Sequence, residues 1–404
     1  MNQETPIIAE AVQRPVADTA FGVIVAISIC HLLNDMMQAL LPAIYPALKQ
    51  DLGLTFGQIG LITFVYQVTG SVLQPVIGSV SDRRAIPMAL PGGPLFSVAG
   101  LAVLSIAHTF WIVLLGAVLL GSGSAVFHPE ASRVARMAAG KRHGLSQSIF
   151  QVGGNFGSAL GPLAAAVVVV RWGQSSLVFF SLLALLACAI LWNVVAWYRE
   201  QAPVRVPKHA EAPHPLGKMP RHARQGIGIL VALIFSKYIY LAGFASFYTF
   251  YLIEQFGVSL RDSQIYLFVF MAAAAVGTIA GGPLGDRFGR RYVIWFSILG
   301  MLPFTLILPY VGLFWIGPVS VMIGLIMSSA FPAIIVYAQE LVPGRVGMIS
   351  GLFYGLSFGV AAIGAAALGW LADLIGIVEV YRIIAFLPAI GLLAAFLPRA
   401  EAEA

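Results

Sequence analysis

The chain has 404 residues, of which 59% are hydrophobic and only 10% charged, with a mean hydropathy of +0.89. A soluble protein of this size would have too few polar side chains to cover its surface, so soluble fold classes are excluded. The net charge of +6 is divided among short loops and does not form one basic patch, which argues against nucleic-acid binding. The excess apolar surface predicts helices that face lipid.

Apolar runs follow one another along the whole sequence. There are twelve of them, at about 21–48, 56–80, 86–106, 110–136, 145–170, 176–198, 226–253, 263–285, 292–311, 315–338, 347–372 and 380–397. They lack the period-two alternation of barrel strands, and most reach the roughly 20 residues that a helical span needs. We therefore expect an all-α integral membrane protein with twelve transmembrane helices in two six-helix bundles.

Polar segments divide the chain into the expected units. These are an N-terminal tail (1–19), an N-terminal bundle (20–198), a linker (199–225), a C-terminal bundle (226–398) and a C-terminal tail (399–404). The first tail lacks the basic-then-apolar order of a cleaved signal peptide, so we expect the first run to insert uncleaved. The linker is rich in proline, and its histidines are irregularly spaced, which favours a solvated segment over a metal tract.

Basic residues are concentrated on one side of this topology. With both termini in the cytoplasm, 18 of the 23 Lys and Arg residues lie in cytoplasmic segments. The positive-inside rule therefore orients the chain with both termini cytoplasmic. The expected location is a bacterial cytoplasmic (inner) membrane, crossed many times.

The two halves repeat each other. Asp82-Arg83 follows the second run and Asp286-Arg287 the eighth, while Pro129 and Pro332 are 203 residues apart. The segment from Gly282 to Arg291 resembles the cytoplasmic loop signature of the major facilitator superfamily. An Asp in such a loop can cap a helix and pair with an Arg, which stabilises one state of a carrier. We expect Asp82, Asp286 and Arg287 to contribute to a cytoplasmic gate.

Ionisable residues lie deep inside two of the runs. Asp35 and Lys237 are each flanked by apolar residues, and intramembrane charges usually serve ion or substrate handling. His31 lies one helical turn before Asp35, where an imidazole can relay protons. We expect Asp35 to couple transport to protons, with His31 in both coupling and substrate binding. Lys237 is expected to bind an anionic substrate, with Asp35 or Glu130 as its counter-charge in the empty carrier.

Polar and aromatic stripes on other helices point to a shared aqueous cavity. The further residues that we expect to bind substrate there are Gln67, Gln151, Asn155, Tyr240, Phe244 and Tyr248. The glycines around Gly157 and Gly161 resemble the antiporter signature of drug exporters, but close helix packing explains them equally well.

The fourth run ends in a polar segment with several roles. Glu130 and Arg133 are spaced for an intrahelical pair, which we expect to belong to the gate. His128 points about 200° away from Glu130 around the helix. Both His128 and Glu130 are nevertheless candidates for proton coupling.

Several strings, including 31–35, 128–136, 144–155 and 337–345, resemble a group of bacterial drug exporters within this superfamily. The resemblance implies proton antiport of a small phosphonate with a hydroxamate end, such as fosmidomycin. Proton symport of organic anions or another small metabolite is the alternative, since the same cavity would permit it. A membrane enzyme is disfavoured because no metal-spaced cluster, nucleophile elbow or Walker loop occurs. We expect no cofactor and no metal, with substrate, protons and lipid as partners of a monomer.

Overall fold

The computed structural model describes residues 19–83, 86–140, 143–201, 221–341 and 346–398, where all regular structure is helical. The first half contains α1 (Phe21–Ala43), α2 (Tyr45–Leu52), α3 (Phe56–Arg83), α4 (Ala89–Ser105), α5 (Phe110–Ala138), α6 (His143–Ala164), η1 (Ala165–Val169), α7 (Val170–Trp172), η2 (Gln174–Ser176) and α8 (Leu177–Gln201). The second half contains α9 (Arg221–Phe256), α10 (Leu260–Phe288), α11 (Arg290–Leu299), α12 (Leu302–Ile307), η4 (Leu308–Tyr310), α13 (Leu313–Ser328), α14 (Ala330–Leu341), α15 (Val346–Ile375), α16 (Ile377–Ile384) and η5 (Leu387–Phe396).

The helices account for the twelve expected spans. Eleven segments of the described chain are long and apolar enough to cross a membrane, and α4 is a shorter apolar helix of 17 residues. At 1.5 Å per residue α4 extends about 26 Å, slightly less than a typical hydrocarbon core. The predicted all-α membrane fold with twelve spans is confirmed.

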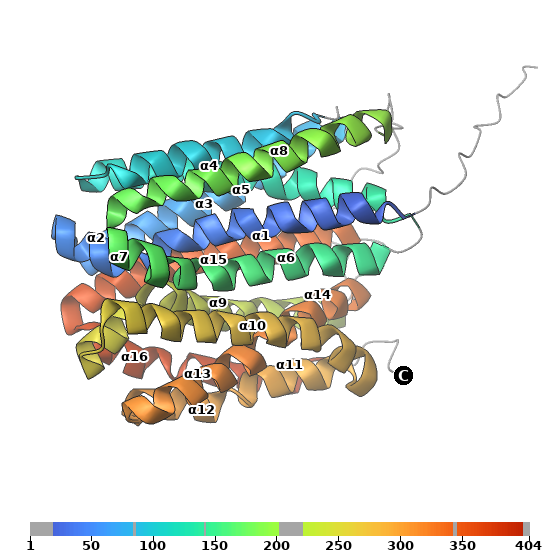
Figure 1. The fold of residues 1–404 in the computed structure, drawn as a ribbon. Coiled ribbons are helices and arrows are strands. Elements are labelled where there is room, and N and C mark those ends of the chain that lie inside the picture. Colours follow the sequence, from blue (N-terminus) through green and yellow to red (C-terminus); the bar gives the residue numbers. More distant parts are fainter. Residues whose placement is uncertain (1–18, 84–85, 141–142, 202–220, 342–345, 399–404) are drawn as a thin grey trace, which may run out of the picture.

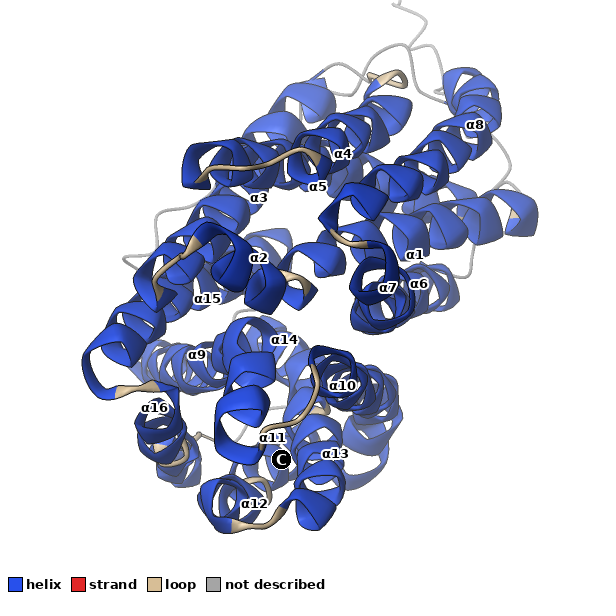
Figure 2. Ribbon diagram, turned by 60° about the vertical axis from the view of Figure 1, so that its left-hand side comes forward, coloured by secondary structure: helices blue, strands red, loops and turns tan. Residues whose placement is uncertain are grey.

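The helices form two groups that lie side by side (Figures 1 and 2). One group consists of α1 to α8 and the other of α9 to η5, and they meet where α3 packs on α15 and α6 packs on α10. Both α1 and α9 begin at the same end of the molecule, and α8 and η5 finish there. We call this the terminal end and the other the opposite end.

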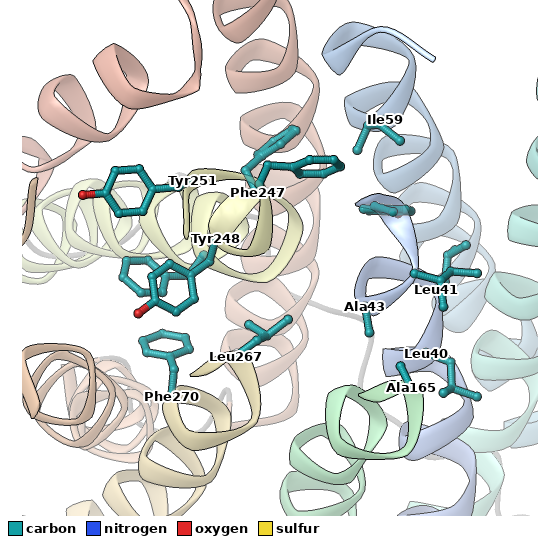
Figure 3. Close-up of a cluster of buried hydrophobic side chains, with 14 of the residues drawn as sticks. Leu40, Leu41, Ala43, Ile59, Ala165, Phe247, Tyr248, Tyr251, Leu267 and Phe270 are labelled. Carbon is teal, nitrogen blue, oxygen red and sulfur yellow. The ribbon is translucent and has the colours of Figure 1, made fainter. Parts of the chain in front are cut away.

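Hydrophobic side chains pack differently at the two ends. At the opposite end one core joins both bundles, with residues such as Leu41 and Ala165 from the first half and Tyr248 and Phe270 from the second (Figure 3). At the terminal end each bundle has its own core, around Phe127 in the first and around the α9 and α11 side chains in the second. The bundles are therefore joined at the opposite end and packed separately at the terminal end.

Backbone contacts strengthen the joined end. A Cβ added to Gly60 of α3 would lie 2.5 Å from the carbonyl oxygen of Ala365 in α15, so only glycine permits this approach. Nearby, the carboxylate of Asp373 in the last turn of α15 accepts hydrogen bonds from the backbone N–H groups of Phe56 and Gly57, both at 2.7 Å. A carboxylate of one bundle thus caps the first turn of a helix in the other.

Candidate functional site

Three ionisable side chains from two helices meet in the middle of the first bundle. His31 and Asp35 lie one turn apart on α1, with 3.3 Å between Nε2 and Oδ2. His128 of α5 approaches the other carboxylate oxygen, with 3.2 Å between Nε2 and Oδ1. Two imidazoles therefore face the two oxygens of one carboxylate, and we call this group the His–Asp–His cluster.

Backbone carbonyls hold both imidazole rings in place. Nδ1 of His31 lies 2.8 Å from the carbonyl oxygen of Phe150 in α6, and the two rings stack with centroids 4.0 Å apart. Nδ1 of His128 lies 2.9 Å from the carbonyl oxygen of Ser124, one turn earlier on α5. A carbonyl oxygen only accepts, so each Nδ1 carries a hydrogen and each Nε2 is free to serve Asp35.

The cluster lies at the boundary between the two kinds of core. Met36 and Met37, directly after Asp35, belong to the core that joins the bundles, whereas Phe127 and Phe150 belong to the separate core of the first bundle. The side chain of His31 is 4% exposed, compared with 18% for Asp35 and 24% for His128. Asp35 and His128 are therefore partly accessible, whereas His31 is buried.

Glycines of α6 allow this close arrangement. A Cβ on Gly153 or Gly157 would lie 2.2 Å from backbone oxygens of α1, so these residues serve close helix packing. Gly154 differs, because a Cβ there would lie 2.4 Å from Cε1 of His31 and 2.9 Å from Oδ2 of Asp35. Gly154 therefore forms the wall against which the cluster rests.

We expect Gly154→Ala to separate His31 from Asp35 and to reduce transport at least tenfold, because the added methyl group occupies the place of the imidazole. Gly228→Ala on α9 is the matched control, since no atom lies within 4 Å of its added Cβ. Transport per molecule of membrane-inserted protein, quantified by immunoblot, is the measurement. Equal transport by both variants would show that the contact with Gly154 is unimportant.

Buried polar atoms without partners surround the cluster. Asn34 donates to Oδ1 of Asp35 at 3.0 Å, while its own Oδ1 has no partner among the described residues. Gln38 accepts from the Tyr66 hydroxyl of α3 at 2.6 Å, and its Nε2 lacks a partner, as does Nδ2 of Asn155 on α6. Buried polar groups are normally paired, so these atoms indicate that water or a ligand binds nearby.

Glu130 lies apart from the cluster. Its carboxylate is fully buried, accepts a hydrogen bond from Tyr198 of α8 at 3.0 Å and lies 3.9 Å from Nε of Arg133. The expected intrahelical pair is confirmed, and the structure places it inside the first bundle between α5 and α8. A gating or proton role for Glu130 and Arg133 stays a prediction.

Lys237 of α9 is buried in the second bundle. It is 6% exposed, and Nζ donates to the hydroxyl of Ser297 in α11 at 3.1 Å. Among the described residues no carboxylate lies within ion-pair distance of it. Asp35 and Glu130 have other partners, so the expectation that one of them neutralises Lys237 is wrong for this structure. The ammonium has a neutral partner instead of a counter-charge.

The aromatic residues expected in the pocket pack in the joined core. Phe244 stacks on Tyr248 and Phe270, with ring centroids 4.6 and 4.3 Å apart, and Tyr240 is adjacent to it. All are nearly fully buried, and the Tyr248 hydroxyl bonds Ser320 at 2.6 Å. In this structure they pack on Phe270 and Ser320 within the second bundle, and contact with substrate stays a prediction.

The remaining predicted site residues lie outside the His–Asp–His cluster or have side chains outside the described residues. Gln67 and Gln151 are half-buried on α3 and α6. The side chains of Asp82 and Asp286 lie outside the described residues, whereas Arg287 is exposed with its guanidinium 5.3 Å from the centre of the Phe288 ring.

One pocket of about 300 Å³ occurs at the opposite end beside Tyr266 and contains none of the predicted site residues.

The His–Asp–His cluster is also the described group whose atoms could converge on a metal ion, since one ligand atom of each residue lies within 4.8 Å of the others. We assign no metal to it, because each imidazole Nε2 already faces a carboxylate oxygen at hydrogen-bond distance. Two imidazoles paired with one carboxylate are groups that can exchange protons near neutral pH.

Sequence reasoning overlooked Asp373. An acid in the last turn of a helix is opposed by the helix dipole, and Gly376 directly after α15 marks that end of the helix. An acid in this unfavourable position indicates that its carboxylate has a partner outside its own helix. The sequence does not show that this partner is the first turn of α3.

Comparisons with known proteins agree with this architecture. The family model described as Major Facilitator Superfamily matches residues 27–356 and 230–404. The chain is 52% identical to the fosmidomycin resistance protein of Escherichia coli (strain K12), over 98% of this chain and 97% of that protein. It is 42% identical to an uncharacterized MFS-type transporter of Bacillus subtilis (strain 168), over 97% and 96%.

Solved structures share the fold. The nucleoside transporter NupG has a TM-score of 0.74 at 11% identity, covering 93% of this chain and 100% of that one. A bacterial homolog of the human lysosomal transporter Spinster, in an inward-facing and occupied conformation, also has a TM-score of 0.74, at 15% identity over 94% and 95%.

Proposed function

Because this chain belongs to the Major Facilitator Superfamily of transporters, we propose that it exports a small anionic, drug-like molecule in exchange for protons. The observation that carries this proposal is the His–Asp–His cluster, in which a carboxylate and an imidazole halfway along α1 meet a second imidazole from α5. Ionisable groups at such depth are costly and usually functional.

The orientation follows from charge. Lys and Arg are concentrated in the segments of the terminal end, so we place this end in the cytoplasm and the protein in the bacterial cytoplasmic membrane. The opposite end, where one core joins the bundles, then faces outward. In this arrangement the cluster exchanges protons with the cytoplasm, as a carrier does after inward proton movement.

The substrate class is proposed from the relative and from the cations of the chain. The Escherichia coli relative is named for resistance to fosmidomycin, a phosphonate. Phosphonate oxygens accept strong hydrogen bonds from cations. Lys237, whose hydrogen-bond partner among the described residues is the Ser297 hydroxyl, is the group that we propose to bind an anion.

We expect Lys237→Met to weaken fosmidomycin binding about tenfold or more, because it removes a buried charge while keeping a flexible apolar side chain. Ser297→Ala is the control, since it removes the hydroxyl partner and leaves the ammonium in place. Equilibrium binding to purified protein is the measurement. Unchanged affinity in Lys237→Met would exclude the lysine from anion binding.

One observation also favours the alternative, proton symport of an organic anion. Two protonated imidazoles and one carboxylate carry a net positive charge, which attracts an anion, and linkage then makes protons and anion bind together. Antiport instead requires that substrate binding and proton binding oppose each other.

Transport in proteoliposomes separates these functions. With fosmidomycin inside and an acidic exterior, an exporter driven by antiport releases the drug faster than at equal pH. A symporter instead releases it faster when the interior is acidic. Counterflow with a panel of phosphonates and organic cations then defines the substrate class. Fluxes that do not respond to a pH gradient in either direction would contradict proton coupling altogether.

A further inference from the structure

The two imidazoles of the His–Asp–His cluster meet opposite oxygens of the same carboxylate. We infer that the cluster binds two protons as one unit and that two protons move for each substrate molecule. This inference rests on the proposed proton coupling, and it adds the number of protons and the part of each histidine.

One side of each imidazole ring faces a backbone carbonyl oxygen. Nδ1 of His31 lies 2.8 Å from the Phe150 carbonyl oxygen, and Nδ1 of His128 lies 2.9 Å from that of Ser124. A bare Nδ1 at these distances would place two lone pairs against each other, so each Nδ1 keeps its hydrogen. These two hydrogens are structural and take no part in exchange.

The other side of each imidazole ring faces Asp35. A bare Nε2 opposite an ionised carboxylate oxygen is again a contact of two lone pairs, so each of the two contacts requires a proton between nitrogen and oxygen. The distances of 3.3 Å to His31 and 3.2 Å to His128 admit one hydrogen bond each. The arrangement therefore holds two exchangeable protons and, with both bound, a net charge of +1.

Neighbouring helices add no further ion pair among the described residues. The groups around the cluster are the amide of Asn34, which donates to Asp35, and the hydroxyl of Ser124 on α5, 3.0 Å from Nδ1 of His128. On α3 the nearest titratable group, Tyr66, is bonded to Gln38. On α6 the wall is Gly154, which has no side chain.

Loss of one proton therefore changes the geometry. One imidazolium can remain paired with Asp35, but the other Nε2 then faces a carboxylate oxygen without a proton and has to move away. The closed arrangement seen here corresponds to the doubly protonated unit. A carrier that changes state with this unit intact transfers both protons together.

A reversal experiment on the full-length protein in proteoliposomes tests the number. With the membrane potential clamped at zero and a roughly hundredfold fosmidomycin gradient, net drug flux stops at a pH difference of about one unit for two exchanged protons and about two units for one. Protons that the drug itself carries are determined by titrating the drug and are subtracted from the count. A stoichiometry of one proton per drug molecule in the wild type would overturn the inference and leave proton coupling intact. Flux independent of pH would overturn the proposed function.

The His128→Gln variant tests whether the second proton binds at His128. Glutamine at this position keeps an N–H donor for Asp35 but has no exchangeable proton, so His128→Gln should transport with a stoichiometry of one. The control is His108→Gln, an exposed histidine bonded to the backbone of Ile106, which should keep a value of two. A stoichiometry of two that persists in His128→Gln would contradict the assignment.

Discussion

We expect the Asp35→Asn variant to lose drug accumulation driven by a pH gradient, by at least tenfold, while exchange at equal pH stays within about twofold of wild type. Asparagine has nearly the same shape, but it lacks the negative charge that holds the two exchangeable protons on the imidazoles. Coupling is therefore removed with little change in packing. Flux of labelled fosmidomycin in proteoliposomes, with and without a gradient, measures both quantities.

Asp51→Asn is the matched control for this variant. Asp51 is exposed near the end of α2, so the same chemical change there should leave both fluxes unaltered. Full gradient-driven accumulation by Asp35→Asn would show that another group carries the coupled protons.

We expect Asp373→Asn to shift the carrier away from the state in which the opposite end is joined. The carboxylate bonds two backbone N–H groups of α3 at 2.7 Å, and these bonds must break when the bundles separate at that end. An amide oxygen is a weaker acceptor than a carboxylate oxygen, and it has no negative charge to interact with the positive N-terminal end of α3. A loss on the order of 1 to 3 kcal/mol changes the ratio of the two states by about 5- to 150-fold.

Cysteine labelling measures this shift. In a background without Cys30 and Cys188, a cysteine at Gln151 should react more slowly with a reagent at the terminal end when Asp373 is replaced, because that end closes more often. Asp262→Asn is the control, since Asp262 bonds Ser259 within the first turn of α10 and has no hydrogen bond to the first bundle among the described residues. Equal labelling rates in the Asp373→Asn variant and its parent would remove Asp373 from the conformational equilibrium.

The fold could be predicted because its determinants are local. Apolar length alone identifies a transmembrane helix, and the repeat of Asp82-Arg83 by Asp286-Arg287 relates the two halves. Spacing on one helix likewise predicted the contact of His31 with Asp35 and the pair of Glu130 with Arg133, because residues three or four apart share a face.

Contacts between helices were not predictable in the same way. The meeting of His128 with Asp35 depends on how α5 rotates against α1, which no spacing reveals. Lys237 could face the centre of the protein or its own bundle, and in the structure it bonds Ser297 of α11 within its own bundle. Asp373 and Phe56 are 317 positions apart, and only the joining of the bundles brings them together.

Proton release on drug binding shows whether the His–Asp–His cluster binds the coupled protons. Purified wild-type protein in weakly buffered detergent solution near neutral pH should release protons when fosmidomycin is added, because antiport requires that substrate binding oppose proton binding. A pH-sensitive dye records the number released per molecule. We expect release by wild type and none by an Asp35→Asn variant that still binds the drug. Equal release by both proteins would contradict proton binding by the cluster.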